Sequence, residues 1–421
     1  MALIRPFRAL RPAPEVAARV ASVPYDVVST DEARALASGN PLSFLHVTRS
    51  EIDLPRDTDP YAPVVYEQAV RNFEELKRSA PLVIDDQPAL YFYRLRMGAH
   101  EQTGLAACYS LDEYDTDRIK KHERTRRDKE DDRTRHIVGL RAQTGVVFLT
   151  YPASQEVGRI AARVCSGKPL YDIKADDGIT HTVWKVDGND ARALVEAFGR
   201  IPALYIADGH HRAASAARAR QQLRTVGAAA GAAASIVASM APPDTQPCDS
   251  FLAVAFPHDQ VQILPYNRVV KDLAGQTPAE FLEKLRKVLA VRQGSPEPPR
   301  QGVVSMYLGG KWYELDLAGL APKNADRADT LDVSVLQARV IAPLLNVGDV
   351  RTDKRIDFVG GARGTKELER LVDSGKGAVA FSMYPVSVDD LISIADAGGI
   401  MPPKSTWFEP KLRDGLIVHL I

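Results

Sequence analysis

Cysteine is scarce in this chain, and no pattern surrounds the few cysteines that it has. Three cysteines occur in 421 residues, Cys108, Cys165 and Cys248, without CxxC or Cys/His spacing. A disulfide framework and a zinc site are therefore not indicated, and the composition favours a cytoplasmic protein. No apolar run approaches the length of a membrane span, so we expect no membrane partner.

An excess of charge of one sign is also missing. Lysine and arginine total 54, as do aspartate and glutamate, so the formal net charge is zero. A general polyanion binder would be basic, so only a local basic patch would allow nucleic-acid binding. We therefore do not expect nucleic acid as a partner.

The common signatures of nucleotide and hydrolase chemistry are absent as well. The sequence contains no GxxxxGK[ST] loop, no GxGxxG fingerprint, no HExxH and no GxSxG. These absences exclude the usual phosphate loop, the dinucleotide-binding turn, the zincin helix and the nucleophile elbow. Any phosphate or substrate site must be built from other residues.

The composition that is present is that of a soluble protein too long for one core. Hydrophobic residues make up 45% and charged residues 26% of the chain, which predicts two or three domains. Runs of strand length alternate with helical stretches, so we expect an α/β (α+β) fold with mixed sheets. The expected regions are an N-terminal α/β region over 1–115, a core over 116–245 and a C-terminal α/β region over 246–421.

Local patterns predict individual elements. Strands are expected over 89–93, 105–109, 146–149, 201–207, 303–308 and 312–317, and helices over 66–78, 156–165, 189–198, 336–345 and 364–374. The segments 97–101 and Gly309-Gly310 predict hairpin turns. The small-residue segment 226–234 predicts a helix-to-helix connection or a packing surface, and Pro242, Pro243 and Pro247 mark a boundary or loop.

The most informative segment is Asp208-Gly209-His210-His211-Arg212, between an apolar run and an alanine-rich helical stretch. A strand-to-helix turn leaves backbone N–H groups unpaired at the positive end of the helix dipole, which favours an anion. Gly209 allows close approach of a ligand, and Arg212 adds a cationic fork. The alternative is a plain N-cap by Asp208 with solvated histidines. Adjacent histidines on a helix diverge by about 100°, which argues against both binding one metal ion.

A charged run over 118–136 is the second notable segment. Its default interpretation is a solvated helix with ion pairs between neighbours. It opens with Lys121, His122, Glu123, Arg124 and Thr125, which surround one carboxylate with cations. A carboxylate so placed can act as a general base or a metal ligand once substrate excludes water.

The segment 401–411 allows two interpretations. Lys404, Ser405 and Thr406 could bind a phosphate or a carboxylate, or the prolines could form a rigid loop that closes a core through Trp407 and Phe408. Arg268, at the end of another apolar run, is a further candidate for the same anion.

The His-Glu pair upstream of Asp-Gly-His-His-Arg resembles the free-serine kinases of the ParB/sulfiredoxin-like superfamily. Members of that superfamily bind nucleotide phosphates on a strand-to-helix turn with a Gly-x-x-Arg pattern, matched here by Gly209 to Arg212. The resemblance implies a ParB/sulfiredoxin-like nucleotide-binding core, with Glu123 as the base for the substrate hydroxyl. It also implies that Asp208 lies beside the phosphates and Mg²⁺.

Over its whole length the chain resembles a broad family of uncharacterised bacterial and archaeal proteins, some of which look like ATP-dependent serine kinases. The matching features are Val23-Pro24-Tyr25-Asp26-Val27, Lys121-His122-Glu123-Arg124-Thr125, Ala207-Asp208-Gly209-His210-His211-Arg212, Arg351-Thr352-Asp353, Arg355-Ile356-Asp357-Phe358 and Pro403-Lys404-Ser405-Thr406.

The sequence therefore predicts a cytoplasmic kinase that uses ATP, ADP or CTP with Mg²⁺ to phosphorylate a small molecule, with free L-serine as the first choice. Phosphoryl transfer needs positioning and electrostatics, for which these residues are suited. Lys121, Arg124 and Lys404 are candidates for neutralising charge or binding the serine carboxylate. Two alternatives stay open: a ParB-like nucleotide switch or clamp, and a scaffold without catalysis. A homodimer is compatible with each.

Overall fold

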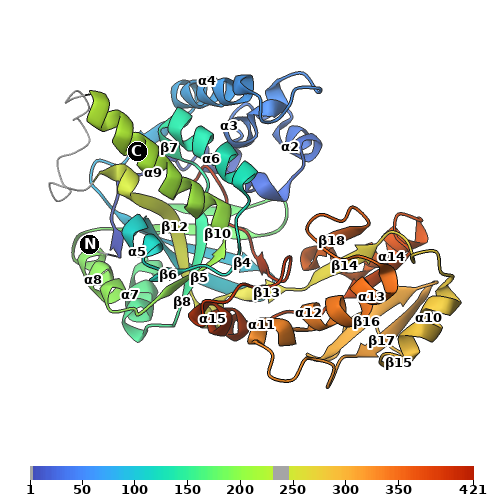
Figure 1. The fold of residues 1–421 in the computed structure, drawn as a ribbon. Coiled ribbons are helices and arrows are strands. Elements are labelled where there is room, and N and C mark those ends of the chain that lie inside the picture. The colour runs from blue at the N-terminus through green and yellow to red at the C-terminus, as the bar shows by residue number, and fades with distance from the viewer. Residues whose placement is uncertain (1–2, 231–245) are drawn as a thin grey trace. The chain divides into compact units, whose positions relative to one another are not determined.

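The computed structural model describes residues 3–230 and 246–421, and the chain divides into two compact units (Figure 1). The first unit comprises Met1–Val261 and Pro410–Ile421, and the second comprises Gln262–Glu409. The second unit is thus inserted into the sequence of the first. This division differs from the three predicted regions, because strands from 1–115 and from 116–245 share one sheet.

The first unit is built on a nine-stranded mixed sheet. Its strands run in the order β6-β11-β8-β12-β5-β4-β10-β9, and β1 pairs with β5 beyond the end of β4. Their bounds are β1 (Ile4–Arg5), β4 (Leu90–Met97), β5 (His100–Ser110), β6 (Ile119–Lys120), β8 (Val147–Tyr151), β9 (Tyr171–Lys174), β10 (Thr180–Val186), β11 (Leu204–Asp208) and β12 (Ser250–Pro257). Two pairs are parallel, β6 with β11 and β8 with β12, and the remaining pairs are antiparallel.

Helices and two small strand pairs complete this unit. The helices are α1 (Ala17–Val20), α2 (Thr30–Ala37), α3 (Leu45–Thr48), α4 (Pro63–Ser79), α5 (Leu111–Asp115), α6 (Arg127–Leu140), α7 (Gln155–Cys165), α8 (Gly188–Gly199) and α9 (His210–Ala230). The strand pairs are β2 (Leu10–Pro12) with β3 (Leu82–Ile84) and β7 (Ala142–Gln143) with β21 (His419–Leu420). Helices α6 and α9 lie side by side (Figure 1). Alternate residues of the strands and the apolar faces of the helices form the main core.

The predicted hairpin over 97–101 is confirmed. Strands β4 and β5 pair antiparallel, and Gly98 in the connecting turn has φ +59°. A two-residue turn with a left-handed glycine matches the twist of the strands it joins.

The prediction of a solvated helix over 118–136 was wrong in two respects. The run begins with strand β6, and α6 starts only at Arg127. Helix α6 buries His136 and Ile137 because it packs on both α9 and α4, and the His136 ring hydrogen-bonds to the carbonyl oxygen of Val47.

The second unit is built on a six-stranded antiparallel sheet in the order β15-β17-β16-β19-β14-β18. Its strands are β14 (Tyr266–Val270), β15 (Ala290–Gln293), β16 (Val303–Leu308), β17 (Lys311–Asp316), β18 (Ile356–Gly360) and β19 (Val379–Ser382), with a separate pair of β13 (Gln262–Leu264) and β20 (Trp407–Glu409). The helices are α10 (Pro278–Arg286), α11 (Arg327–Thr330), α12 (Asp332–Leu336), α13 (Ala342–Leu345), α14 (Gly364–Asp373) and α15 (Val388–Asp396).

Two predictions for this unit are confirmed and one is refined. The hairpin at Gly309-Gly310 joins β16 to β17, and both glycines have positive φ. Helix α14 (Gly364–Asp373) matches the helix predicted over 364–374 to within one residue. The helix predicted over 336–345 is interrupted, since a π-helical turn over Gln337–Ile341 separates α12 from α13.

Part of the predicted small-residue connection falls outside the described residues. Positions 226–230 continue α9, whereas 231–234 and the prolines 242 and 243 are not described. Pro247 begins a short 3-10 turn directly before β12. Among the described helices, none is both long enough and apolar enough to cross a bilayer.

Gly104 marks a close approach of β5 to its neighbour β12. A Cβ atom at this position would lie 2.7 Å from Cγ1 of Val254 and 2.8 Å from the carbonyl oxygen of Ala255. We predict that Gly104→Ala destabilises the first unit by about 1–3 kcal/mol, because overpacked cores shift strands apart. The measurement is denaturant unfolding followed by circular dichroism.

Gly158 provides the matched control on the same unit. It lies within α7, and a Cβ atom there would have no neighbour within 4 Å. Gly158→Ala should therefore stabilise the unit by roughly 0.5–1 kcal/mol through helix propensity. Equal unfolding midpoints for the two variants would contradict the close approach of β5 and β12.

Candidate active site

The two motifs singled out in the sequence meet at one edge of the first sheet. Strands β6 and β11 are adjacent and parallel, with Leu204 opposite Ile119 and Tyr205 opposite Lys120. The segment Lys121–Thr125 follows β6, and Asp208–Arg212 ends β11 and opens α9. Because parallel neighbours end at the same edge, the two loops are brought together although 85 positions separate Glu123 from Asp208.

The predicted strand-to-helix turn is confirmed. Strand β11 ends at Asp208, Gly209 follows with φ +94°, and α9 begins at His210. The strand lies three residues later than the expected start at 201, and the helix begins three residues before the expected Ala213. A Cβ atom on Gly209 would lie 3.1 Å from both Cζ and Nε of Arg212, so backbone conformation and packing both favour glycine.

His210 links the two loops. Its side chain is buried, and its ring lies 4.4 Å, centre to centre, from that of His122 in an edge-to-face arrangement. The backbone N–H of His122 donates to Nε2 of His210 at 3.4 Å, and Nδ1 lies 3.7 Å from Oε2 of Glu123. Burial, followed by the neighbouring His122, holds the pKa of His210 well below its ordinary value. We therefore assign the proton of the neutral ring to Nδ1, which faces Glu123.

His122 is buried with neither ring nitrogen hydrogen-bonded within the part of the chain that the structure describes. Burial lowers the pKa of His122 to about 4, so the ring is neutral at pH 7. Buried polar groups usually have partners, so an unpaired one calls for an explanation such as a catalytic role or a bound ion. The exposed Glu123 carboxylate, in contrast, has a side chain 55% accessible to solvent.

The role predicted for Arg212 in binding phosphate stays a prediction, and the structure shows which groups its guanidinium contacts. The side chain is 7% exposed, and Nη2 lies 3.2 Å from carboxylate oxygens of both Asp208 and Asp26. Its Nη1 donates to the carbonyl oxygen of Val146. Two carboxylates and one carbonyl thus engage the two terminal nitrogens of the guanidinium, whereas Nε is buried without a hydrogen-bond partner among the described residues. The ion pair with Arg212 holds Asp208 in place.

Two cationic side chains contact the same carboxylate oxygen of Asp208. Its Oδ2 lies 3.2 Å from Nη2 of Arg212 and 3.3 Å from Nζ of Lys411. Burial alone would raise the pKa of Asp208, but Lys411 and Arg212 outweigh it and hold the pKa below its ordinary value. The carboxylate is therefore ionised at neutral pH.

Three residues of this cluster were missed as site residues by sequence reasoning. Asp26 lies in the Pro24-Tyr25-Asp26 segment and Lys411 directly follows Pro410, so both were within quoted or discussed motifs without a role. No sequence pattern marked Asp414 as a site residue. It is buried, and burial raises the pKa of its carboxyl to about 7 despite the nearby Arg212. Only folding brings these three positions to the turn.

The remaining residues of the first motif have mixed surroundings. The Lys121 ammonium contacts Asp117 at 2.6 Å and lies 4.2 Å above the ring of Tyr114, so its charge is partly satisfied. Arg124 is exposed, and the hydroxyl of Thr125 donates to Glu130 on α6. Nε2 of His211 accepts from the N–H of Arg126 at 3.0 Å, which ties the start of α9 to the start of α6.

The other predicted anion-binding residues belong to the second unit. Arg268 lies on β14, and its Nη2 donates to the carbonyl oxygen of Lys404 at 3.0 Å. Lys404 is exposed with φ +55°, and Ser405 Oγ donates to Pro402 O at 2.7 Å. Thr406 precedes β20, whose Phe408 is buried. Phe408 is thus buried, as the core-closing interpretation of 401–411 expects, and Trp407 is half-buried. The anion-binding interpretation of Lys404, Ser405 and Thr406 stays a prediction.

The described residues hold no dedicated all-protein metal cluster. The described residues contain no group of three or more His, Cys, Asp or Glu side chains arranged to hold a metal ion. Mg²⁺ commonly binds through one or two carboxylates together with substrate phosphates and water. Asp208 is the carboxylate of the turn that could serve in this way, and its ion pairs with Arg212 and Lys411 are both made through Oδ2.

Comparison with known proteins adds three similar solved structures and no curated match. The conserved hypothetical protein from Pyrococcus furiosus is 14% identical, with a TM-score of 0.35, covering 75% of this chain and 95% of that one. A free serine kinase in complex with AMP is 14% identical, with a TM-score of 0.36 and coverage of 74% and 91%. SbnI with C-terminal truncation from Staphylococcus aureus is 14% identical, with a TM-score of 0.39 and coverage of 75% and 87%. No curated protein sequence matches the chain.

The family comparison covers both motifs of the candidate site. The family described as "Protein of unknown function (DUF1015)" matches residues 4–334, which include the whole of Lys121–Thr125 and Asp208–Arg212. Since the match extends over far more than half of the sequence, this chain belongs to the DUF1015 family.

Proposed function

We propose that this protein is a nucleotide-dependent kinase that transfers a phosphoryl group from ATP to the hydroxyl of free L-serine, giving O-phosphoserine. One observation carries the proposal: an exposed carboxylate, Glu123, lies beside a glycine-containing turn at a helix N-terminus, and His210 connects the two. Phosphoryl transfer to a hydroxyl requires at least a proton acceptor close to a turn that can bind the phosphates.

The phosphates of the nucleotide would bind at the start of α9. The first N–H groups of a helix lack intrahelical partners and point along the positive end of the dipole. Gly209 keeps side-chain bulk away from this position. Arg212 acts as a positioning residue, since its guanidinium holds Asp208 and is itself held by Asp26. The unsatisfied ring nitrogens of His122 are candidates to contact a bound phosphate.

The chemical step needs one proton acceptor and charge stabilisation. The serine hydroxyl oxygen attacks the terminal phosphorus, the bond from that phosphorus to the bridging oxygen breaks, and ADP leaves. Glu123 accepts the hydroxyl proton, and the neutral His210 keeps its Nδ1–H directed at that carboxylate. Arg124 is the exposed cation of the same loop and is suited to the serine carboxylate. Asp208 would hold Mg²⁺, which supplies neutralisation of phosphate charge when it is bound.

We predict that Glu123→Gln lowers kcat for O-phosphoserine formation by about 10²–10⁴-fold, because the amide cannot accept the hydroxyl proton. The assay incubates purified protein with Mg-ATP and a pool of free amino acids and small alcohols, and mass spectrometry follows the products. The matched control is Glu75→Gln, an exposed glutamate on α4 that pairs with Arg78 in the same unit. The control should retain wild-type turnover.

The same assay separates the alternatives. A wild-type protein that hydrolyses ATP or CTP slowly and phosphorylates no acceptor would make the chain a nucleotide switch or clamp. A protein that binds no nucleotide would make it a scaffold. Repeating the assay with ADP and CTP identifies the donor, and full turnover by Glu123→Gln would remove the role proposed for this carboxylate.

We predict that Gly209→Ala weakens nucleotide binding about tenfold or more. A side chain at a left-handed position costs about 1–2 kcal/mol, and the added methyl group would also press on the Arg212 guanidinium. Isothermal titration with a non-hydrolysable ATP analogue measures the change. Gly199→Ala at the end of α8, where a Cβ atom would have no neighbour within 4 Å, is the control and should bind as the wild type does.

A further inference from the structure

Lys411 brings a cation to the candidate site from a distant part of the sequence. It belongs to the segment Pro410–Ile421, with which the chain returns to the first unit after the second. Its Nζ lies 3.3 Å from Oδ2 of Asp208, the residue that ends β11 directly before the turn at Gly209. The side chain is 12% exposed, so part of it remains accessible to a ligand.

The residues that follow Lys411 fix its backbone. The N–H of Arg413 donates to the hydroxyl of Tyr93 at 3.3 Å, and Asp414 exchanges two backbone hydrogen bonds with Ser22, of 3.0 and 2.9 Å. Ordering a flexible side chain opposes ligand binding, and a side chain that is already held loses less conformational entropy. The position of this lysine therefore favours contact with a further anion.

The charge balance of the turn depends on Lys411. Arg212 and Lys411 contribute two positive charges, and Asp26 and Asp208 contribute two negative charges. Asp414 adds a further negative charge when it ionises, because burial raises the pKa of its carboxyl to about 7. Without Lys411 the cluster would be negatively charged at neutral pH, and a phosphate beside it would be repelled.

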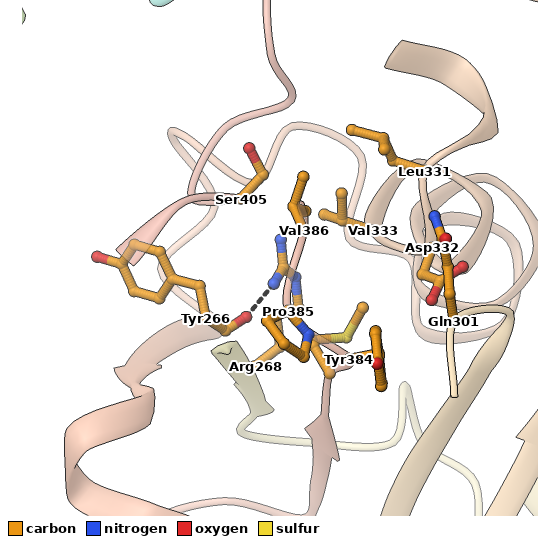
Figure 2. A pocket seen from close by; sticks show the side chains of 11 residues that line it. Tyr266, Arg268, Gln301, Leu331, Asp332, Val333, Tyr384, Pro385, Val386 and Ser405 are labelled. Atoms are coloured by element: carbon orange, nitrogen blue, oxygen red, sulfur yellow. Dashed lines mark hydrogen bonds between the residues drawn. The ribbon is translucent and has the colours of Figure 1, made fainter. Parts of the chain in front are cut away.

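Other cations that the sequence offered for this anion are engaged by protein groups. Both terminal nitrogens of Arg212 have partners, and the Lys121 ammonium contacts a carboxylate and a backbone carbonyl. Arg268 of the second unit donates through both terminal nitrogens to backbone carbonyl oxygens, and Figure 2 shows its bond to Tyr266. Lys411 differs, because it shares a carboxylate oxygen with Arg212. Asp208 thus keeps a cationic partner when Lys411 contacts another anion.

We propose that Lys411 is a phosphate-binding residue of the candidate site, which donates to a phosphate oxygen of the nucleotide at the start of α9. This inference rests on the proposed nucleotide-dependent function and adds a contact from outside both sequence motifs. An ammonium is a compact charge with three donors, so it can contact Asp208 and a phosphate oxygen together. The ion pair with Asp208 holds it beside the turn before the nucleotide binds.

The first test is isothermal titration of the full chain with ATP in EDTA, which removes any contribution of Mg²⁺. Lys411→Met should weaken ATP binding about 10–100-fold, the typical effect of losing a hydrogen bond to a charged group. Lys411→Arg keeps the charge and should recover part of the affinity. ATP affinity that is unchanged in Lys411→Met would overturn the proposal.

Lys185 on β10 provides the matched control. It is a half-buried lysine whose Nζ lies 3.1 Å from Oδ1 of the buried Asp85, and four strands separate β10 from β11 in the sheet. Lys185→Met removes a comparable ion pair from the same unit. It should bind ATP as the wild type does, and an equal loss in both lysine variants would assign the effect to general destabilisation and overturn the proposal.

The second test separates contact with phosphate from an effect through Asp208. In the Asp208→Asn background the ion pair is already absent, so a lysine that only positions Asp208 has no further role. Lys411→Met should still weaken ATP binding by a similar factor in this background. No further loss there would overturn the proposal. The double variant also guards against misfolding, because it leaves no Asp208 carboxylate without its lysine.

The two proposals fail in different ways. A wild-type chain that binds no nucleotide would overturn the proposed function and this inference together. Nucleotide binding by the wild type that is insensitive to Lys411→Met would overturn the role of Lys411 alone.

Discussion

The parallel pairing of β6 with β11 is the constraint on which the candidate active site depends. Strand β6 is only two residues long, yet it fixes the loop that carries Glu123 beside the turn that carries Asp208. The neighbouring strand β8 runs antiparallel to β11, so its chain leaves the sheet at the opposite edge. The polar residues of the two motifs consequently lie close together, and the connection that follows β8 does not occupy the same edge of the sheet.

A network of charges beneath the turn stabilises this arrangement. Arg212 connects four segments that are far apart in the sequence, because it contacts Asp26, Val146 and Asp208, and Asp208 in turn contacts Lys411. Removing one member of a buried network leaves the others unpaired, which costs more than the loss of a single contact. The cluster therefore stabilises the fold of the first unit and also holds the residues of its candidate site in position.

Local chemistry could be predicted from the sequence, and long-range pairing could not. The Gly309-Gly310 hairpin and the turn at Gly209 were recognisable because a left-handed backbone there requires glycine. The run over 118–136 was misinterpreted, because its charges concealed a two-residue strand and a helix whose inner face is buried against α9. Arg212 was predicted as a ligand contact because neither of its carboxylate partners was known to be near. The buried state of Arg268 likewise had no local signal, since it follows from the position of β14 inside a sheet.

The insertion of the second unit has a consequence for the order in which the protein is made. Lys411 and Asp414 follow 148 inserted residues, 262–409, in the chain. At about 5–20 residues per second, a ribosome takes roughly 7–30 s to cross that insertion. During this interval the nascent first unit carries Asp208 and Arg212 without Lys411, and β7 without its partner β21. The charge network at the candidate site is thus completed only after the whole second unit has emerged.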